Sequence, residues 1–540
     1  TNAVEIISTD DGFANQTSLP LPNDADTGIP ETDFTRGQAF YDLVIEVDPT
    51  DDNIVYTGGI DLFKTTDGGS TWNQISKWSN NNALAGLNVS YVHADQHAMA
   101  FGNNSASTVM FAHDGGISYS SDAGTTISSR NKNYNTVQFY KGAIGPDVVN
   151  EKLLAGAQDN GSQLIGNGAG ASPGINSSTE IYGGDGAYVF IDKDKKYMIA
   201  SYVYNNYYYK GYTNPFAPIL AYDIVTDDNT GDFINPAALD DANDVLYTNG
   251  TSGTSYKINR YVLGTVSATA SNFTNVLLTG TPTAFKPSTF TNTTLFVGTD
   301  NGKLFKITGA NSAPVWTDIT GNNFYGSISC IELGATQNEI FVTFYNYGVT
   351  SIYYSNDGGS TWQNKEGNLP DLPVRAILMN PLNPNEVIVG TDLGVWASPN
   401  FNDVSPNWYQ SQNGMKDVIV TSFDLRTADN TVLASTYGRG MFTGQFTADA
   451  STLSVKNIDF NDIIKIYPTV SDGNFKIAAS NEVRQGTLNI FDLSGKEVYA
   501  SKVDFNSNLI QEVSLNASSG MYIVKFKSDN KQSTHRIIIK

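Results

Sequence analysis

Residues 47–72 read VDPTDDNIVYTGGIDLFKTTDGGSTW, and this stretch contains the pattern that decides the fold. It predicts a strand that ends in an Asp/Pro turn, a second apolar strand over 54–58 and a third over 62–65. The segment Thr65-Thr66-Asp67-Gly68-Gly69-Ser70-Thr71-Trp72 follows the third strand. In such a turn Asp and Thr side chains cap backbone amides, Gly permits a positive φ, and Trp buries its ring between sheets.

The same unit recurs through residues 1–446. A close copy runs from Met379-Asn380-Pro381 to Val389-Gly390 and continues through Gly394-Val395-Trp396. The second strands are expected to end near positions 57, 112, 156, 200, 247, 297, 343, 389 and 434, at intervals of 44–55 residues. This period is typical of four-stranded propeller blades. The sequence therefore predicts an all-β fold with a β-propeller of seven to nine blades.

The Asp-containing turn has further copies. Ser355 to Trp362 is complete, Ser120 to Thr126 is nearly complete, and Ser8-Thr9-Asp10-Asp11-Gly12 is a broken copy. These turns resemble the Asp-boxes of sialidase, sortilin and xyloglucanase-type propellers. That resemblance implies a structural role for five side chains, namely Asp67, Trp72, Asp122, Asp357 and Trp362.

The broken copy predicts that Val4-Glu5-Ile6-Ile7-Ser8 is a third strand of a blade. Two arrangements would follow. Either this strand completes the last blade and closes the ring, or it belongs to a blade whose other strands lie upstream.

Charge and composition exclude several classes of protein. The chain has 540 residues, with 54 acidic and 32 basic side chains and a net charge of −22. Residues 451–540 hold 9 acidic and 11 basic side chains, so the excess of negative charge belongs to residues 1–450. Such a field repels a phosphate backbone and argues against nucleic-acid partners. No apolar run is long enough for a transmembrane helix, and the single cysteine, Cys330, excludes an intramolecular disulfide.

Residues 456–540 have a different pattern, with period-two strands between turns, which predicts a small Ig-like β-sandwich. Tyr467-Pro468, Gly473-Asn474-Phe475, Asp492 to Lys496, Ser519 to Tyr522 and a basic end follow in order. This order resembles the C-terminal sorting domain of the type IX secretion system. The resemblance implies export across a Bacteroidota outer membrane, contact with that machinery, and a final location in the medium or at the outer cell surface. We therefore expect a propeller over 1–446, a linker over 447–455 and a sorting domain over 456–540.

The expected propeller geometry separates two faces. Asp-boxes join third to fourth strands on one face, so the turns from second to third strands share the other. Asp/Asn-Gly is also an ordinary hairpin signal, which leaves turn formation as the alternative role. The candidate ligand-binding residues in these turns and the adjoining strands are His93, Asp95, His97, His113, Asp114, Gln158, Asp159, Asp185, Asp300, Asp392 and Arg439.

His93-Ala94-Asp95-Gln96-His97 occupies the place of an innermost strand, where alternate side chains would share a face. His93, Asp95 and His97 together would suit a divalent metal such as Zn²⁺. A hydrogen-bonded polar strand and direct contact with a ligand remain alternatives. The series His-Ala-Asp-x-His, Gln-Asp-Asn-Gly and Gly-Gly-Asp-Gly resembles secreted Bacteroidota propellers described only as glycosyl-hydrolase-like, a family without a settled activity.

These observations predict an exported propeller that binds a glycan or a protein partner without catalysis. A rim rich in carboxylates repels acidic glycans, so a neutral polymer, a cation-bridged polymer or a basic protein patch is expected. A glycoside hydrolase is the alternative, and it would place two rim carboxyls about 6.5–9.5 Å apart for an inverting reaction. Whether the protein is an enzyme stays open at this point.

Overall fold

The computed structural model describes residues 5–448 except 81, 103, 104, 167–177, 412, 413 and 416, and residues 464–540 except 480–482, 494, 507, 529 and 530. The chain divides into two compact units, Thr1–Phe446 and Thr447–Lys540. Most of the predicted linker lies outside the described residues. Within those residues the regular structure is strand, apart from the 3₁₀ turns η1 (Asn82–Gly86) and η2 (Pro218–Leu220).

The first unit begins with a short hairpin and two four-stranded antiparallel sheets. The hairpin pairs β1 (Ile6–Ser8) with β2 (Thr17–Leu19). A short parallel pair, β7 (Ser76–Lys77) and β8 (Ser90–Tyr91), lies between the two sheets in sequence. The sheets consist of β3 (Val44–Val47), β4 (Val55–Gly58), β5 (Leu62–Thr65) and β6 (Asn73–Gln74), then β9 (Gln96–Phe101), β10 (Val109–His113), β11 (Gly116–Ser120) and β12 (Ser128–Ser129).

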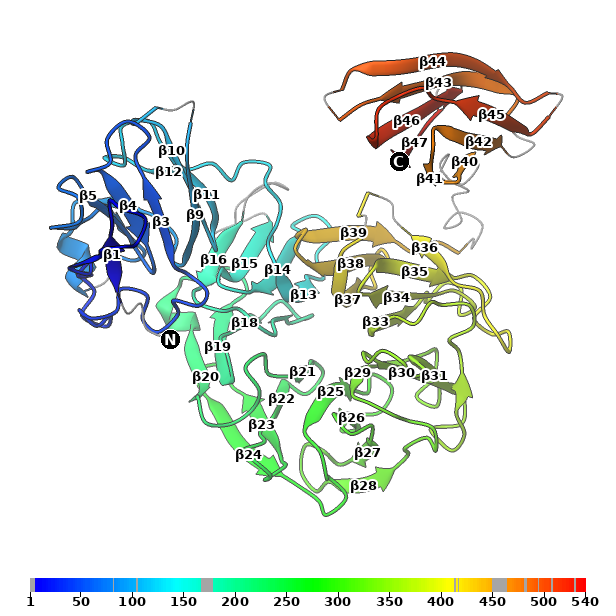
Figure 1. Cartoon of the computed structure of the whole chain (residues 1–540). Coiled ribbons are helices and arrows are strands. Elements are labelled where there is room, and N and C mark those ends of the chain that lie inside the picture. Colours follow the sequence, from blue (N-terminus) through cyan, green and yellow to red (C-terminus); the bar gives the residue numbers. More distant parts are fainter. Residues whose placement is uncertain are drawn as a thin grey trace. The chain divides into compact units, whose positions relative to one another are not determined.

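Seven further antiparallel sheets follow in sequence, and each is a simple meander (Figure 1). Their strands are β13 (Phe139–Ile144), β14 (Lys152–Ala157), β15 (Gly161–Gly166), β16 (Thr179–Tyr182); β17 (Phe190–Ile191), β18 (Tyr197–Ser201), β19 (Asn205–Gly211), β20 (Tyr222–Asp227); β21 (Ala237–Asp240), β22 (Val245–Asn249), β23 (Ile258–Leu263), β24 (Ala268–Phe273); β25 (Pro282–Pro287), β26 (Leu295–Thr299), β27 (Leu304–Thr308), β28 (Val315–Asp318); β29 (Ile328–Leu333), β30 (Ile340–Phe344), β31 (Ile352–Ser355), β32 (Gln363–Asn364); β33 (Val374–Met379), β34 (Val387–Thr391), β35 (Gly394–Ser398), β36 (Tyr409–Ser411); and β37 (Ile419–Arg426), β38 (Thr431–Tyr437), β39 (Met441–Gln445).

The predicted repeat is confirmed at the level of the strands. All nine expected second strands are present, from β4 to β38. Several of them, such as Val387–Thr391, are buried along their whole length, because both of their faces are covered. The apolar clusters therefore lie between successive sheets: one cluster, for example, joins Phe296 and Leu304 to Ile331 and Val342.

The first and the last of these seven sheets are in contact. Strand β13 packs against β37 and β38 (Figure 1). The Gly142 amide donates to Ser422 Oγ at 3.2 Å, and Thr421 Oγ1 donates to the Phe139 carbonyl at 2.9 Å. Arg426, with a side chain only 4% exposed, binds Asp429 and reaches Glu151 Oε2 at 2.7 Å. Residues about 280 positions apart in sequence therefore form one interface.

Strand β1 does not join β37–β39. It pairs with β2, and Ile6 packs on the cluster of Phe34 and Phe63 beside the sheet of β3–β6. Of the two arrangements that the sequence left open, the one in which this strand completes the last sheet is therefore ruled out. The apolar side chain of Ile6 is covered instead by the sheet of β3–β6, which is the nearest sheet in sequence.

Four Asp turns share one hydrogen-bond pattern. In residues 65–72 the Thr65 hydroxyl accepts the Gly69 amide at 3.0 Å, and Asp67 Oδ1 accepts the Thr71 amide at 2.9 Å. Residues 120–127 and 355–362 repeat both bonds through Asp122 and Asp357. The broken copy keeps them with Thr9 and Asp11. The indole nitrogens of Trp72 and Trp362 donate to the carbonyls of Pro20 and Ile319 on neighbouring segments.

The second unit consists of two sheets around one core. Three strands pair as β40 (Ile464–Tyr467), β42 (Asn474–Ala479) and β45 (Ile510–Ser514); the other sheet has the order β41 (Val470–Ser471), β47 (Lys531–Ile539), β46 (Gly520–Ser528), β43 (Gln485–Phe491), β44 (Glu497–Asp504). Side chains of both sheets, among them Ile477, Leu488 and Phe526, form a single apolar cluster.

Asp192, in the turn between β17 and β18, is a buried carboxyl away from any candidate site. One oxygen accepts the Lys196 amide at 2.7 Å, while the other has no hydrogen-bond partner among the described residues. Burial raises its pKa to about 6. Because the native pKa lies above that of the unfolded chain, the associated stability is complete below about pH 4 and is lost as the pH rises through about 6.

We therefore expect Asp192→Asn to melt about 1–3 °C above the wild type at pH 8 and at nearly the same temperature at pH 4. Thermal unfolding followed by circular dichroism at the two pH values measures this. Asp194→Asn in the same turn is the control, because its carboxyl is 68% exposed. An equal shift at both pH values would contradict the assignment.

Candidate functional site

The junction between the sheets β9–β12 and β13–β16 brings together most of the predicted site residues. The turn from β10 to β11 and the turn from β14 to β15 meet there. Asn160 Nδ2 donates to the Asp114 carbonyl at 3.1 Å, and His93 Nε2 lies 2.8 Å from the Asp159 carbonyl. Both turns join second to third strands, so the meander places them at the same end of their sheets.

Three carboxylates converge at this junction. One side-chain oxygen from each of Asp95, Asp114 and Asp159 lies within 4.8 Å of the other two. Burial, followed by the charge of Asp114, raises the pKa of Asp95 to about 6. The pKa of Asp159 is also raised, by burial first and then by Asp185, Asp114 and Asp95. The three groups thus repel one another in a partly desolvated place.

The expectation of one continuous strand over residues 93–97 is wrong. Strand β9 begins at Gln96, and Asp95 has φ of 64°, which is the left-handed region. Asx side chains tolerate this conformation better than most. As a result His93 and Asp95 lie in a turn rather than on one strand face with His97.

The ring nitrogens of His93 and His97 face oxygen atoms of the protein. His93 contacts the carbonyls of Ala94 and Asp159 at 3.1 and 2.8 Å. His97 contacts the Tyr41 carbonyl at 3.1 Å and Asp114 Oδ1 at 2.5 Å. In this arrangement the two imidazoles hold the turns in place, and the side chains that converge with Asp95 are Asp114 and Asp159.

His113 is a buried neighbour of His93. It is 7% exposed, stacks on His93 with ring centroids 5.9 Å apart, and its Nε2 lies 2.9 Å from Ser118 Oγ. Burial, with a further contribution from His93, lowers the pKa of His113 to about 4. The ring is therefore neutral at physiological pH, and it packs against His93.

The segment before β3 completes the junction and was not predicted. Tyr41 OH donates to Asp114 Oδ1 at 3.0 Å, and Gln38 Nε2 reaches Asp95 Oδ1 at 3.4 Å. Asp42 is fully buried, and neither of its carboxylate oxygens has a hydrogen-bond partner among the described residues. Burial, then Asp95, raises the pKa of Asp42 to about 7.

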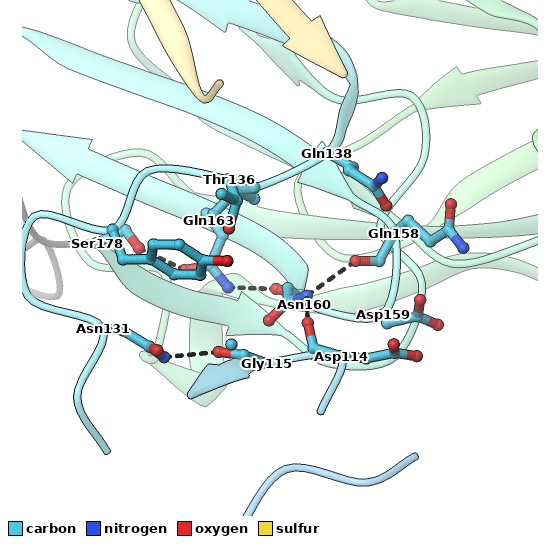
Figure 2. A pocket seen from close by; sticks show the side chains of 13 residues that line it. Asp114, Gly115, Asn131, Thr136, Gln138, Gln158, Asp159, Asn160, Gln163 and Ser178 are labelled. Carbon is cyan, nitrogen blue, oxygen red and sulfur yellow. Dashed lines mark hydrogen bonds between the residues drawn. The ribbon is translucent and has the colours of Figure 1, made fainter. Parts of the chain in front are cut away.

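A polar pocket of about 210 Å³ opens beside the carboxylates (Figure 2). Gln138, Gln158 and Asp159 lie on one side of it, and Gln163 and Ser178 on the other. Ser178 Oγ donates to Gln163 Oε1 at 2.6 Å, which fixes the orientation of that amide. The remaining described lining residues are Asp114, Gly115, Gly116, Asn131, Tyr134, Thr136, Val137 and Asn160.

Gln158 connects this pocket to the last sheet of the unit. Its Oε1 accepts hydrogen bonds from the hydroxyls of Tyr140 and Tyr437. Asp185 Oδ1 accepts the Asp159 amide at 2.9 Å and so supports the same turn from the other side. The exposed Arg439 lies in the turn after β38, and its carbonyl accepts Asn135 Nδ2 at 2.7 Å.

Two predicted residues make their contacts within their own sheets. Asp300 Oδ1 accepts the Thr281 amide at 3.0 Å, and Asp392 pairs with Arg375 Nε at 2.6 Å. Both lie in turns from second to third strands, as predicted. Neither belongs to the group formed by Asp95, Asp114 and Asp159. They fit the alternative role of turn residues.

Comparison with known proteins identifies the second unit. Residues 465–540 match the family model of the secretion system C-terminal sorting domain. The chain is therefore that of a Bacteroidota protein exported by the type IX system to the cell surface or the medium. No curated protein matches the chain. Among the described residues, no helix is long and apolar enough to cross a membrane.

Proposed function

We propose that this exported protein is an Asp-box β-propeller that binds a neutral glycan in the pocket between β9–β12 and β13–β16. In this proposal the seven sheets from β13 to β39 form the blades of a closed ring, and the sheets β3–β6 and β9–β12 lie outside it. The contact of β13 with β37 and β38 supports closure. The shared hydrogen bonds of the four Asp turns support the Asp-box class.

The chemistry of the pocket carries the functional part of the proposal. Its described lining has five carboxamide side chains and two carboxylates, without a lysine or an arginine. Carboxamides and carboxylates pair with sugar hydroxyls, which both donate and accept. Tyr134, 51% exposed, adds a flat apolar face at the rim. The negative charges of Asp114 and Asp159 would repel an acidic glycan, so a neutral glycan is the ligand that fits.

Tyr134→Ala is expected to weaken glycan binding by about 3–10-fold, which is the loss of one aromatic contact. The full chain is screened by affinity electrophoresis against neutral plant and algal polysaccharides, and the best ligand is titrated by calorimetry. Tyr409→Ala is the matched control, because Tyr409 is 59% exposed on β36, away from the pocket. The proposal fails if no neutral polymer binds, or if both variants bind as the wild type does.

A glycoside hydrolase is the second candidate, and one observation favours it. Asp159, whose pKa is raised, lies beside Asp114, and such a pair can divide the roles of acid and base. However, oxygens within 4.8 Å are closer than the separation of about 6.5–9.5 Å in inverting enzymes, so the spacing argues against the inverting kind and is nearer to the value of about 5–5.5 Å in retaining ones. Released reducing ends, assayed with the same polysaccharides, distinguish catalysis from binding.

A further inference from the structure

We propose that Asp95, Asp114 and Asp159 bind a calcium ion. The three residues come from the turn before β9, the turn after β10 and the turn after β14, and one oxygen from each meets within 4.8 Å of the others. Calcium takes oxygen ligands at about 2.3–2.6 Å, so ligands on the same ion lie at most about 5 Å apart. The observed convergence matches that requirement.

The charge balance of the junction supports a cation. The charged groups that act most strongly on Asp159 are other carboxylates, and those that act on Asp95 are Asp114, then His93 and His97. The two imidazoles already face protein oxygens through both nitrogens. Three converging carboxylates in a partly desolvated site repel one another, and a bound cation would relieve that repulsion, as protonation also does.

The buried carboxylate of Asp42 is a second reason to place a cation here, and it does not depend on the convergence of the three aspartates. Its side chain is fully buried, and neither oxygen has a hydrogen-bond partner among the described residues. Asp95 and then His97 are among its strongest charged neighbours, so its carboxylate lies near the proposed site. An isolated buried carboxylate is costly, so it either takes up a proton or lies near a charge of opposite sign. A calcium ion on the three aspartates would supply that charge, with Asp42 acting through a water or through space.

The three aspartate oxygens favour one divalent ion over the others. Zinc prefers imidazole and thiolate ligands, and here the imidazoles are engaged. Calcium accepts an irregular set of carboxylates, carbonyls and waters, whereas magnesium requires a near-octahedral one. Extracellular modules bind calcium with dissociation constants of about 10⁻⁴–10⁻³ M. A site of this strength is filled wherever the surrounding medium holds calcium above these concentrations.

The test uses the full chain after dialysis against a chelator. Titration with calcium chloride should give one site with a dissociation constant of about 10⁻⁴–10⁻³ M. At about ten times that concentration the melting temperature should rise by about 1–3 °C. Terbium emission sensitised by Tyr41, whose hydroxyl contacts Asp114, should appear on binding and be reversed by calcium.

Three variants define the site. The double variant D95N/D159N should lose the calcium-dependent rise in melting temperature, and Asp42→Asn should weaken calcium binding by about tenfold. Both remove mutual repulsion and should fold without calcium. Asp300→Asn is the matched control, since it lies in an equivalent turn and the amide keeps the acceptor for Thr281.

The inference is overturned if the wild type shows no heat of calcium binding, no shift in melting temperature and no terbium emission. It is overturned equally if zinc binds to the chain and calcium does not. It is also overturned if D95N/D159N keeps the full response or if Asp300→Asn loses it. None of these results depends on whether a glycan binds in the pocket.

Discussion

Deletion of residues 456–540 is expected to leave a folded first unit that accumulates in the periplasm instead of reaching the surface or the medium. The sorting-domain match covers residues 465–540, and this unit has its own apolar core, formed by side chains such as Ile477 and Phe526. Among the described residues the first unit has apolar clusters of its own as well. Removal of an independent domain costs the remaining one little stability.

Cell fractionation and immunoblotting measure the location, and the melting temperature of the truncated protein confirms that it folds. As a gain-of-function control, residues 456–540 are fused to a periplasmic reporter, which should then leave the cell. Normal appearance of the truncated protein in the medium would contradict the role of the sorting domain, and so would retention of the fusion.

The strand order could be predicted because each repeat carries its own signals. Continuous apolar runs such as Val387–Thr391 mark strands buried on both faces, and Asp-Gly turns mark their ends. The Asp turns could be predicted for the same reason, since Asp67 reaches only as far as Thr71. Even the broken copy keeps the two hydrogen bonds of the Asp turn, although only the structure shows that Thr9 and Asp11 accept them.

The site could be predicted only in part because it joins segments that are distant in sequence. His93, Asp114 and Asp159 were predicted as rim residues, and the structure places them in contact or close together. Tyr41 and Asp42 carried no turn or motif signal, and their role depends on how the segment before β3 packs. The strand over 93–97 was mispredicted because period-two polarity does not reveal the positive φ of Asp95.

The central claim of the proposed architecture is that β13–β39 closes into a ring, and an engineered disulfide tests it most directly. A Cβ atom at Gly142 would lie 3.4 Å from Ser435 Cβ, close to the separation of about 3.5–4.5 Å in disulfides. The two residues are about 290 positions apart, so a bond between them would join the first of the seven sheets to the last.

The double variant G142C/S435C is expected to form this bond on air oxidation. Peptide mass spectrometry without reductant should find the crosslink, and the oxidised form should be more stable than the reduced one by up to about 5 kcal/mol. The single variants are controls, and Cys330 is present in all of them. If both new thiols stay free in a folded protein, β13 and β38 do not meet in solution and the closed ring is contradicted.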